Sequence, residues 1–265
     1  MPELPDAEVF KQYFDATALH KPVSGVTVAD ERVLDAVSPQ QLGQALSDRS
    51  FQRVRRHGKY LFAEIESSQR LVVHFGMTGS LKYYEAADAE PEHAQVRFDF
   101  ADGGHLAFVN PRLFGRIALT GDVERFLHEH EIGPDALALS RDEFQEIVGA
   151  STAMVKSTLM DQSKLAGIGN IYSDEILFQA RIHPRERGSR LNAGRLDRLF
   201  DCMREILEKA IERRADPAQM PKNWLIDHRR EGAACPMCGA AIETLEIGSR
   251  TGYYCPSHQS REDPA

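Results

Sequence analysis

The 265-residue sequence has few cysteines and no long apolar segment, and each absence excludes a class of protein. Four cysteines are too few for a disulfide scaffold at this length, and three of them lie within the last 31 residues, which favours a metal site in a reducing compartment. No apolar run approaches the roughly 20 residues that cross a bilayer. The first ten residues carry acids and two prolines where a signal peptide has a basic head and an apolar core. We therefore expect a cytoplasmic protein with no membrane partner.

An excess of positive charge is also missing. The chain has 32 Lys and Arg against 40 Asp and Glu, a formal net charge of −8. This balance argues against a polyanion as partner only if the charge is spread evenly, because the local field at a groove governs phosphate binding. The charge is uneven: residues 151–230 carry 15 Lys and Arg against 11 Asp and Glu, and basic residues also cluster between Arg49 and Lys59. A nucleic-acid partner therefore stays possible.

The length predicts two domains with a small appendage, and the ordinary composition predicts a globular protein. After an amphipathic helix that begins near Pro5, strand-like segments at 60–65, 71–75, 96–100 and 106–109 indicate a first half that is mostly β. From about residue 133 the apolar residues recur at helical spacing. We predict domains at 1–132, 133–230 and 231–262, the last being short, turn-rich and cysteine-bearing.

A tetrad of soft metal ligands is the strongest signal in the sequence. Cys235-Pro-Met-Cys238 is followed, after 16 residues, by Cys255-Pro-Ser-His258, with the length of a β-hairpin between the two pairs. Three thiolates and an imidazole complete the tetrahedral shell of a structural Zn²⁺ without water. Unrelated buried cysteines would explain neither the spacing nor the repeated Cys-Pro. We therefore predict one structural zinc ion bound by Cys235, Cys238, Cys255 and His258.

A glycine-rich junction, Leu165-Ala-Gly-Ile-Gly-Asn-Ile-Tyr172, lies between two helical segments. Gly167 and Gly169 end one helical run, and Asn170 can open the next. Free backbone N–H groups at such a helix start can bind a phosphate. A plain tight turn explains the same residues about as well.

The amino terminus offers a nucleophile. Removal of Met1 would leave Pro2 as a free secondary amine beside Glu3. Such an amine has a pKa near 8, is partly unprotonated at neutral pH, and can attack an electrophilic carbon to form an iminium. Taken alone, Met1-Pro-Glu-Leu-Pro5 is more typical of a simple helix start.

Together, Met1-Pro-Glu-Leu-Pro5, the Gly-Ile-Gly-Asn junction and a cysteine-rich end that closes on Cys-Pro-Ser-His-Gln resemble the formamidopyrimidine-DNA glycosylase and endonuclease VIII family, with formamidopyrimidine-DNA glycosylase the nearer branch. The resemblance spans nearly the whole chain. It implies an α+β protein, with an N-terminal β-sandwich flanked by helices, a helix-two-turn-helix domain and a C-terminal β-hairpin zinc finger.

The resemblance also implies roles for single residues. Pro2 matches the nucleophile that forms a Schiff base at C1′ of the damaged nucleotide, and Glu3 matches its acid partner. Lys59, in Arg-His-Gly-Lys-Tyr-Leu, matches a lysine that assists strand cleavage. Asn170 matches a contact to the DNA backbone, and Arg250 matches the finger arginine that binds the phosphate beside the lesion.

A stacked base must be flipped out before an amine can reach its sugar. The segments His74-Phe-Gly-Met-Thr-Gly and Asn110-Pro-Arg-Leu-Phe-Gly match the family loops that fill the vacated space. They present Met77 and Phe114 as apolar fillers and Arg112 as a donor to the orphaned base. Met and Phe are also common core residues, and Arg112 can be an ordinary solvated charge.

His93 and Lys156 likewise fall at DNA-contact positions of the family, although a surface His or Lys needs no special explanation. Two positions depart from the family pattern. Asp6 stands where a glutamate is usual, so its reach is one methylene shorter, and His258 stands where the fourth ligand is usually cysteine.

The resemblance implies a monomeric base-excision-repair DNA glycosylase with AP lyase activity on double-stranded DNA that contains damaged bases or abasic sites. It would remove oxidised or ring-opened purines and nick the strand by β,δ-elimination. Two alternatives remain: an endonuclease VIII-like glycosylase for oxidised pyrimidines, and a catalytically silent homologue that only binds damaged DNA. Pro2, Glu3 and Lys59 together argue against the silent homologue, because binding alone needs no free amine.

Overall fold

The computed structural model describes residues 2–86 and 89–259, and the chain divides into two compact units. The first unit contains Met1–Pro2 and Asp6–His130, and the second contains Glu3–Pro5 and Glu131–Ala265. Three residues at the amino terminus therefore belong with the second half of the chain. The predicted boundaries 1–132, 133–230 and 231–262 stay predictions, and residues 260–262 lie outside the described residues.

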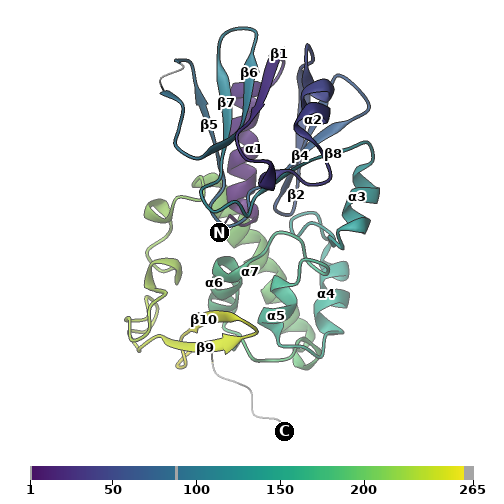
Figure 1. Ribbon diagram of the computed structural model, residues 1–265. Helices are drawn as coiled ribbons and strands as arrows, with labels where there is room; N and C mark the ends of the chain where they lie inside the picture. Colours follow the sequence, from purple (N-terminus) through teal and green to yellow (C-terminus); the bar gives the residue numbers. More distant parts are fainter. Residues whose placement is uncertain (1, 87–88, 260–265) are drawn as a thin grey trace. The chain divides into compact units, whose positions relative to one another are not determined.

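Two four-stranded antiparallel sheets form the first unit (Figure 1). One has the order β1-β6-β7-β5, with β1 (Val23–Val28), β6 (Ala94–Phe100), β7 (His105–Val109) and β5 (Ser80–Tyr84). The other has the order β2-β3-β4-β8, with β2 (Phe51–His57), β3 (Tyr60–Ile65), β4 (Arg70–His74) and β8 (Arg116–Thr120). Short helices accompany them: η1 (Glu31–Val33), α2 (Pro39–Leu46) and α3 (Val123–Glu129).

Aromatic side chains from both sheets and from α1 (Leu4–Ala18) share one core. Phe51 of β2 meets Phe98 of β6 edge to face, with ring centroids 6.0 Å apart. From α1, Phe14 packs on Phe51 at 5.0 Å and Phe10 packs on Phe75 at 4.4 Å. The predicted β-sandwich flanked by helices is therefore confirmed.

The second unit is helical. Its elements are α4 (Arg141–Gly149), α5 (Val155–Met160), α6 (Asn170–Ala180), η3 (Gly188–Arg190), α7 (Ala193–Glu212), η4 (Pro217–Gln219) and η5 (Ile226–His228). Ser140 and Glu143 form a capping box at the start of α4, and Asn192 caps α7. Apolar faces of all four α-helices pack into one core, which also contains Leu4 from the amino terminus.

The chain ends in a two-stranded antiparallel hairpin of β9 (Glu243–Ile247) and β10 (Arg250–Tyr254), as predicted for the finger. Its strands have only five residues each. In the described part of the chain, no helix combines the length and the apolar character needed to cross a membrane.

Candidate active site and DNA-contact residues

The predicted residues are divided between the two units. Pro2, Lys59 and the loop residues Met77, His93, Arg112 and Phe114 belong to the first unit. Glu3, Lys156, Asn170, Arg250 and the four metal ligands belong to the second.

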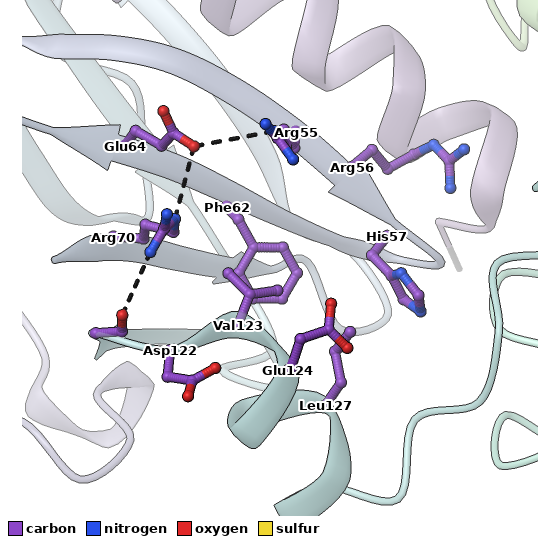
Figure 2. A pocket seen from close by; sticks show the side chains of 11 residues that line it. Arg55, Arg56, His57, Phe62, Glu64, Arg70, Asp122, Val123, Glu124 and Leu127 are labelled. Atoms are coloured by element: carbon purple, nitrogen blue, oxygen red, sulfur yellow. Dashed lines mark hydrogen bonds and ion pairs between the residues drawn. The ribbon is translucent and has the colours of Figure 1, made fainter. Parts of the chain in front are cut away.

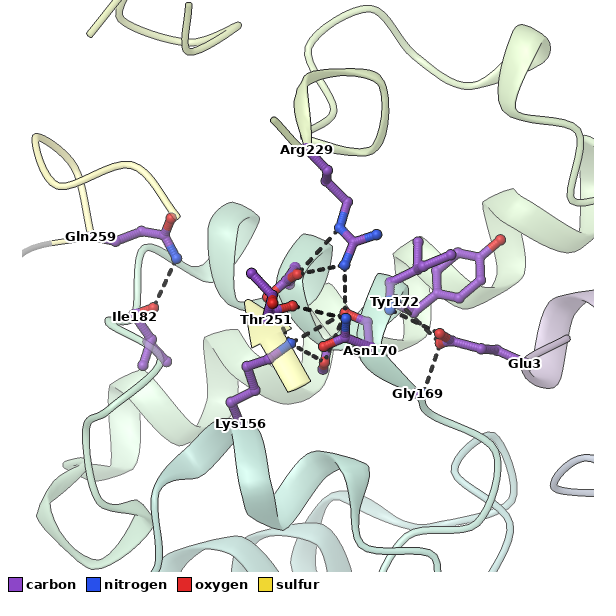
Figure 3. Close-up of polar contacts among 12 residues, drawn as sticks. Glu3, Lys156, Gly169, Asn170, Tyr172, Ile182, Arg229, Thr251 and Gln259 are labelled. Carbon is purple, nitrogen blue, oxygen red and sulfur yellow. Dashed lines mark hydrogen bonds and ion pairs between the residues drawn. The ribbon is translucent and has the colours of Figure 1, made fainter. Parts of the chain in front are cut away.

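Glu3 caps a helix that lies more than 160 residues away in sequence (Figure 3). Its carboxylate accepts hydrogen bonds from the backbone N–H groups of Gly169 at 2.7 Å, Ile171 at 2.8 Å and Tyr172 at 3.2 Å. The side chain is 1% exposed, and the residue before α6 is a glycine that cannot cap the helix itself. A carboxylate at this position satisfies orphaned donors and complements the helix dipole.

The two glycines of the junction are required by this close approach. A Cβ on Gly169 would stand 2.5 Å from Glu3 Cδ, and Gly167 has a φ of +118° with Leu4 Cδ1 only 2.6 Å from an added Cβ. The N–H groups that the sequence suggested as a phosphate site are therefore occupied by Glu3. That interpretation is wrong, because a carboxylate of the same chain binds there.

Pro2 is half-buried and directly precedes the anchored Glu3. Chain termini commonly fray, but here the backbone N–H of Leu4 also donates to Gly167 O at 2.9 Å. The residue that carries the predicted nucleophile is therefore joined to a segment with a fixed position.

Lys59 lies in the two-residue turn between β2 and β3, where Gly58 takes a φ of +55° and His57 pairs with Tyr60. A two-residue hairpin turn holds its side chains at a defined position. Near it, His74 at the end of β4 stacks on Tyr60 with ring centroids 4.6 Å apart. Burial lowers the pKa of His74 to about 4, and the charges of Lys59 and Arg116 act in the same direction. The imidazole is therefore neutral at pH 7.

The two predicted wedge loops are joined by one buried amide. Asn110, 0% exposed, donates from Nδ2 to Phe75 O at 3.2 Å and accepts at Oδ1 from Gly115 N at 3.3 Å. The loops are so close that a Cβ on Gly76 would stand 2.4 Å from the backbone carbon of Phe114. The structure therefore brings the loop of Met77 together with the loop of Arg112 and Phe114.

The side chains of these loops include an exposed pair. Phe114 is 50% exposed, which excludes a core role, and the Arg112 guanidinium carbon lies 5.3 Å from its ring centroid. His93 adjoins the same loop, because its carbonyl oxygen accepts a hydrogen bond from Asn110 N at 3.0 Å. Its backbone φ is +63°, in the left-handed region. Phe114 therefore lies at the surface of this loop, beside the guanidinium of Arg112.

Lys156 differs from the surface residue that the sequence predicts. It is 0% exposed and its ammonium lies 2.6 Å from Asp174 Oδ1, 2.8 Å from Ser173 Oγ and 3.2 Å from Asn170 O (Figure 3). Burial lowers the pKa of Lys156, while Asp174 acts in the opposite direction. All three ammonium protons have acceptors within the protein, so the structure gives no support to a direct contact with DNA.

Asn170 opens α6, and its side-chain Nδ2 donates to Thr251 O at 2.9 Å. Thr251 directly follows Arg250, whose side chain is exposed at the start of β10. Asn170 and Arg250, the two residues of the second unit predicted to contact the DNA backbone, therefore lie on elements that contact each other.

The four predicted metal ligands converge, with all ligand atoms within 4.8 Å of one another. Cys235 Sγ is 3.7 Å from His258 Nδ1, Cys238 Sγ is 3.9 Å from the same nitrogen, and Cys238 Sγ is 3.5 Å from Cys255 Sγ. Zinc bonds of about 2.3 Å to sulfur and 2.0 Å to nitrogen imply ligand separations of roughly 3.5–3.8 Å in a tetrahedron. The cluster therefore fits a metal ion of this kind, and the residues belong to one finger.

Two residues around these sites were given no role by the sequence analysis. Gln259, 0% exposed, accepts from Cys255 N at 2.8 Å and donates to Ile182 O at 3.0 Å, so it ties the finger to the end of α6. Glu175 accepts from Gln179 Nε2 at 2.8 Å and from Ile226 N at 3.0 Å. A buried acid or amide gives no periodic signal, and only the polar character of Glu175 within the apolar α6 could have indicated that residue.

A cavity of about 570 Å³ in the first unit contains none of the predicted site residues (Figure 2). Arg55 and Arg70 approach the same carboxylate oxygen of Glu64, at 3.9 and 3.7 Å. The lining combines acidic and basic side chains, so its charges largely compensate each other. The predicted chemistry therefore does not lie in this cavity.

Known proteins resemble the chain over nearly its whole length. Residues 1–117 match the formamidopyrimidine-DNA glycosylase N-terminal domain, and residues 132–221 match the formamidopyrimidine-DNA glycosylase H2TH domain. The formamidopyrimidine-DNA glycosylase of Pelobacter propionicus is 34% identical over 272 residues, which cover 98% of this chain and 100% of the relative. That of Pelotomaculum thermopropionicum is 32% identical, with 98% and 99% covered.

Solved structures of DNA complexes also resemble the chain over nearly its whole length. A complex between the Lactococcus lactis Fpg and DNA that contains an abasic site superposes with a TM-score of 0.88 at 27% identity, covering 98% of this chain and 100% of that chain. A structure of MutM in complex with DNA containing carbocyclic 8-oxo-G has the same TM-score at 28% identity and the same coverage. Two matched domains and relatives above 30% identity over the full length lead to one conclusion: the chain belongs to the formamidopyrimidine-DNA glycosylase family.

Proposed function

We propose that this protein is a base-excision-repair DNA glycosylase and AP lyase that removes oxidised or ring-opened purines from double-stranded DNA, acting as a single chain. The anchoring of Glu3 carries this proposal. The cap that Glu3 makes on α6 fixes the segment that carries Pro2. A nucleophilic amine at Pro2 needs such a fixed position, whereas a protein that only binds DNA does not.

In the proposed mechanism the nitrogen of Pro2, exposed by removal of Met1, attacks C1′ of the flipped nucleotide. The glycosidic C–N bond breaks, its electron pair leaves with the base, and the Pro2 nitrogen gives up its proton. The nitrogen lone pair then opens the sugar ring: the C1′–O4′ bond breaks, its electron pair goes to the protonated ring oxygen, and an iminium forms between Pro2 and C1′. The resulting iminium acidifies the C2′ proton, whose loss expels the 3′ phosphate by β-elimination, and δ-elimination then expels the 5′ phosphate. Lys59 assists these cleavage steps.

Glu3 is proposed as the acid partner that protonates the sugar ring oxygen. In the structure Oε2 accepts from the backbone N–H groups of Gly169 and Tyr172, and Oε1 accepts from that of Ile171. This arrangement supports an anchoring contribution of Glu3 in addition to the acid role.

Lesion access is assigned to the joined loops. Met77 and Phe114 would fill the space of the flipped base, and Arg112 would donate to the acceptor edge of an orphaned cytosine. Asn170, Arg250 and His93 are proposed to contact the DNA backbone. The exposure of Phe114 and the packing of its loop on the loop of Met77 support this assignment.

We further propose that the ion held by Cys235, Cys238, Cys255 and His258 is zinc. The ligand set and the separations suit a closed tetrahedral site, which supplies folding energy and takes no part in the reaction. His258 would bind through Nδ1, the nitrogen that faces the cysteine sulfurs.

Lesion preference depends on the contacts that the protein segment closing over the flipped base makes with that base. The formamidopyrimidine branch resembled by the sequence carries a longer loop where this chain has only residues 217–232. Here Leu225 is 0% and Trp224 5% exposed, and Gln179 Nε2 donates to Asn223 O at 3.2 Å. A short segment packed onto α6 offers few donors to close around 8-oxoguanine.

We therefore expect strong activity on ring-opened formamidopyrimidines and abasic sites, weaker activity on 8-oxoguanine, and some on oxidised pyrimidines. The test is cleavage of a panel of duplexes, each with one defined lesion opposite each base. Arg112→Ala should relax the preference for opposite cytosine, and the exposed Arg198→Ala should leave it unchanged.

Three results of this panel would revise the assignment. A large preference for 8-oxoguanine opposite C would contradict the argument from the short segment. Oxidised pyrimidines as the best substrates would favour the endonuclease VIII-like alternative. Binding without cleavage of any duplex would favour the silent homologue.

A further inference from the structure

A buried group of three charges lies beside the first turn of α6 (Figure 3). Lys156 of α5 and Asp174 of α6 both have fully buried side chains, and their ammonium and carboxylate are 2.6 Å apart. Arg229, which follows η5, donates to the other carboxylate oxygen of Asp174 from Nε at 3.2 Å and from Nη2 at 2.9 Å. One carboxylate therefore holds two cations that come from different elements.

Stability alone is a weak explanation for such a group. Removing charges from water costs several kcal/mol per ion, and well-packed apolar residues often replace a buried ion pair without loss. Buried charges can instead specify geometry, because each must meet its partner at one distance and angle. The question is what geometry this group specifies.

Both cations reach the same backbone atom. Lys156 Nζ lies 3.2 Å and Arg229 Nη2 lies 3.4 Å from the carbonyl oxygen of Asn170. On its other side, Asn170 Nδ2 donates to Thr251 O of β10 at 2.9 Å. The first residue of α6 is thus held by α5, by the segment after η5 and by the finger.

Strand β10 of the finger also packs directly against Lys156 and Asp174. A Cβ on Gly252 would stand 3.0 Å from Lys156 Cε and 3.3 Å from Asp174 Oδ1, so only glycine fits there without a shift. The guanidinium of Arg229 lies 4.9 Å from the ring centroid of Tyr253. These contacts hold β10 at the residues that directly follow Arg250.

We propose that Asp174 and Arg229 are positioning residues, which together with Lys156 fix Asn170 and Arg250 at the separation needed to bind one DNA backbone. The proposal rests on the proposed function, in which Asn170 and Arg250 contact phosphates. Lys156 and Arg229 then act on DNA through Asn170 and β10, without touching it.

Salt dependence of binding separates positioning from direct contact. The probe is a duplex with one tetrahydrofuran abasic analogue, and its affinity is measured over a series of salt concentrations. Arg250→Ala should lower the slope of log K against log salt by about one, because one phosphate contact is lost. Arg229→Ala should weaken binding by about tenfold with the slope unchanged, because Arg250 keeps its charge close to the phosphate and loses only its exact position. Arg230→Ala, which removes the exposed neighbouring arginine, should change affinity less than twofold.

A mutant cycle tests whether Arg229 affects DNA affinity through Asn170 and Arg250. If Arg229 acts through Asn170 and Arg250, Arg229→Ala should cost less than twofold in a protein that already carries Asn170→Ala and Arg250→Ala. Should Arg229→Ala fail to fold, Arg229→Gln and the isosteric Asp174→Asn take its place with the same expected pattern.

The outcomes distinguish this proposal from the function on which it rests. A full tenfold loss on Arg229→Ala in the doubly substituted protein, or a slope lowered by one, would overturn the positioning role. Unchanged affinity on Arg229→Ala, while Asn170→Ala and Arg250→Ala weaken binding, would also overturn it. If Asn170→Ala and Arg250→Ala leave binding unchanged, the proposed phosphate contacts themselves fail.

Discussion

Glu3 shows what a single residue does that a sequence motif cannot indicate. The sequence predicted it as an acid beside a nucleophile, and the structure adds that it caps α6 through Gly169, Ile171 and Tyr172. Glycine at 169 is explained by the same contact. A bond between residues more than 160 positions apart leaves no local pattern, so the sequence suggested a phosphate for this helix start instead.

Lys156 illustrates the opposite difficulty. Lysine is rarely buried unless it is paired, so its side chain was expected at the surface. Here Asp174, Ser173 and Asn170 provide three acceptors within the core. None of these three contacts is visible in the sequence, because each forms only when α5 packs on α6.

His74 provides a test at the level of one titrating group. Its pKa is about 4 in the folded protein and near 6.5 in an unfolded chain, so between these values the unfolded state binds more protons. The free energy of unfolding should therefore fall by roughly 2–3 kcal/mol as the pH falls from 6.5 to 4. His74→Phe, which keeps the ring against Tyr60 but cannot titrate, should reduce this fall.

The measurement is urea unfolding of both proteins across that pH range. His128→Gln, a change at an exposed histidine, serves as the control and should follow the unsubstituted protein. Parallel loss of stability in the His74→Phe protein and the control would show that His74 is not the group responsible.

At the scale of elements, apolar or alternating central strands were predictable and irregular edge strands were not. The segment 60–65 coincides with β3, and 96–100 lies within β6. β2 was missed because its Arg-rich sequence hides the pattern and its register shifts between Phe51 and Arg53. β1 contains Gly25 at a similar irregularity.

The finger is the element whose stability depends most on a ligand. Its core cluster contains five buried residues, Phe178, Leu225, Cys235, Ile242 and Cys255, and two of these are proposed metal ligands. Such a core is too small to hold a hairpin without metal. The metal pattern was readable from sequence because its spacing is local, whereas the tie through Gln259 was not.

We expect one zinc per chain in freshly purified protein. Chelation should unfold the finger and weaken binding of abasic-site DNA by about as much as Arg250→Ala does, while most helical circular dichroism remains. Metal analysis without zinc, or unchanged DNA affinity after complete chelation, would contradict this prediction.

At the scale of the whole molecule, the order of sandwich, helical region and hairpin was predictable because each part has its own periodicity and the finger has its own motif. The assignment of Glu3–Pro5 to the second unit was not, since it depends on the cap at α6. The acidic net charge gave little guidance, because the local field at a groove governs phosphate binding more than the sum over the chain does.

The central claim is that the amine of Pro2 forms a covalent intermediate with damaged DNA. Borohydride reduction during reaction with an abasic-site duplex should trap a protein–DNA adduct, and peptide mapping should place it at Pro2. Pro2→Gly should reduce base removal by about 100-fold or more, because a nucleophile and its acid partner act as a unit. A protein extended at its amino terminus, in which Pro2 has no free amine, should give no adduct. A full yield of adduct from that extended protein would contradict the account.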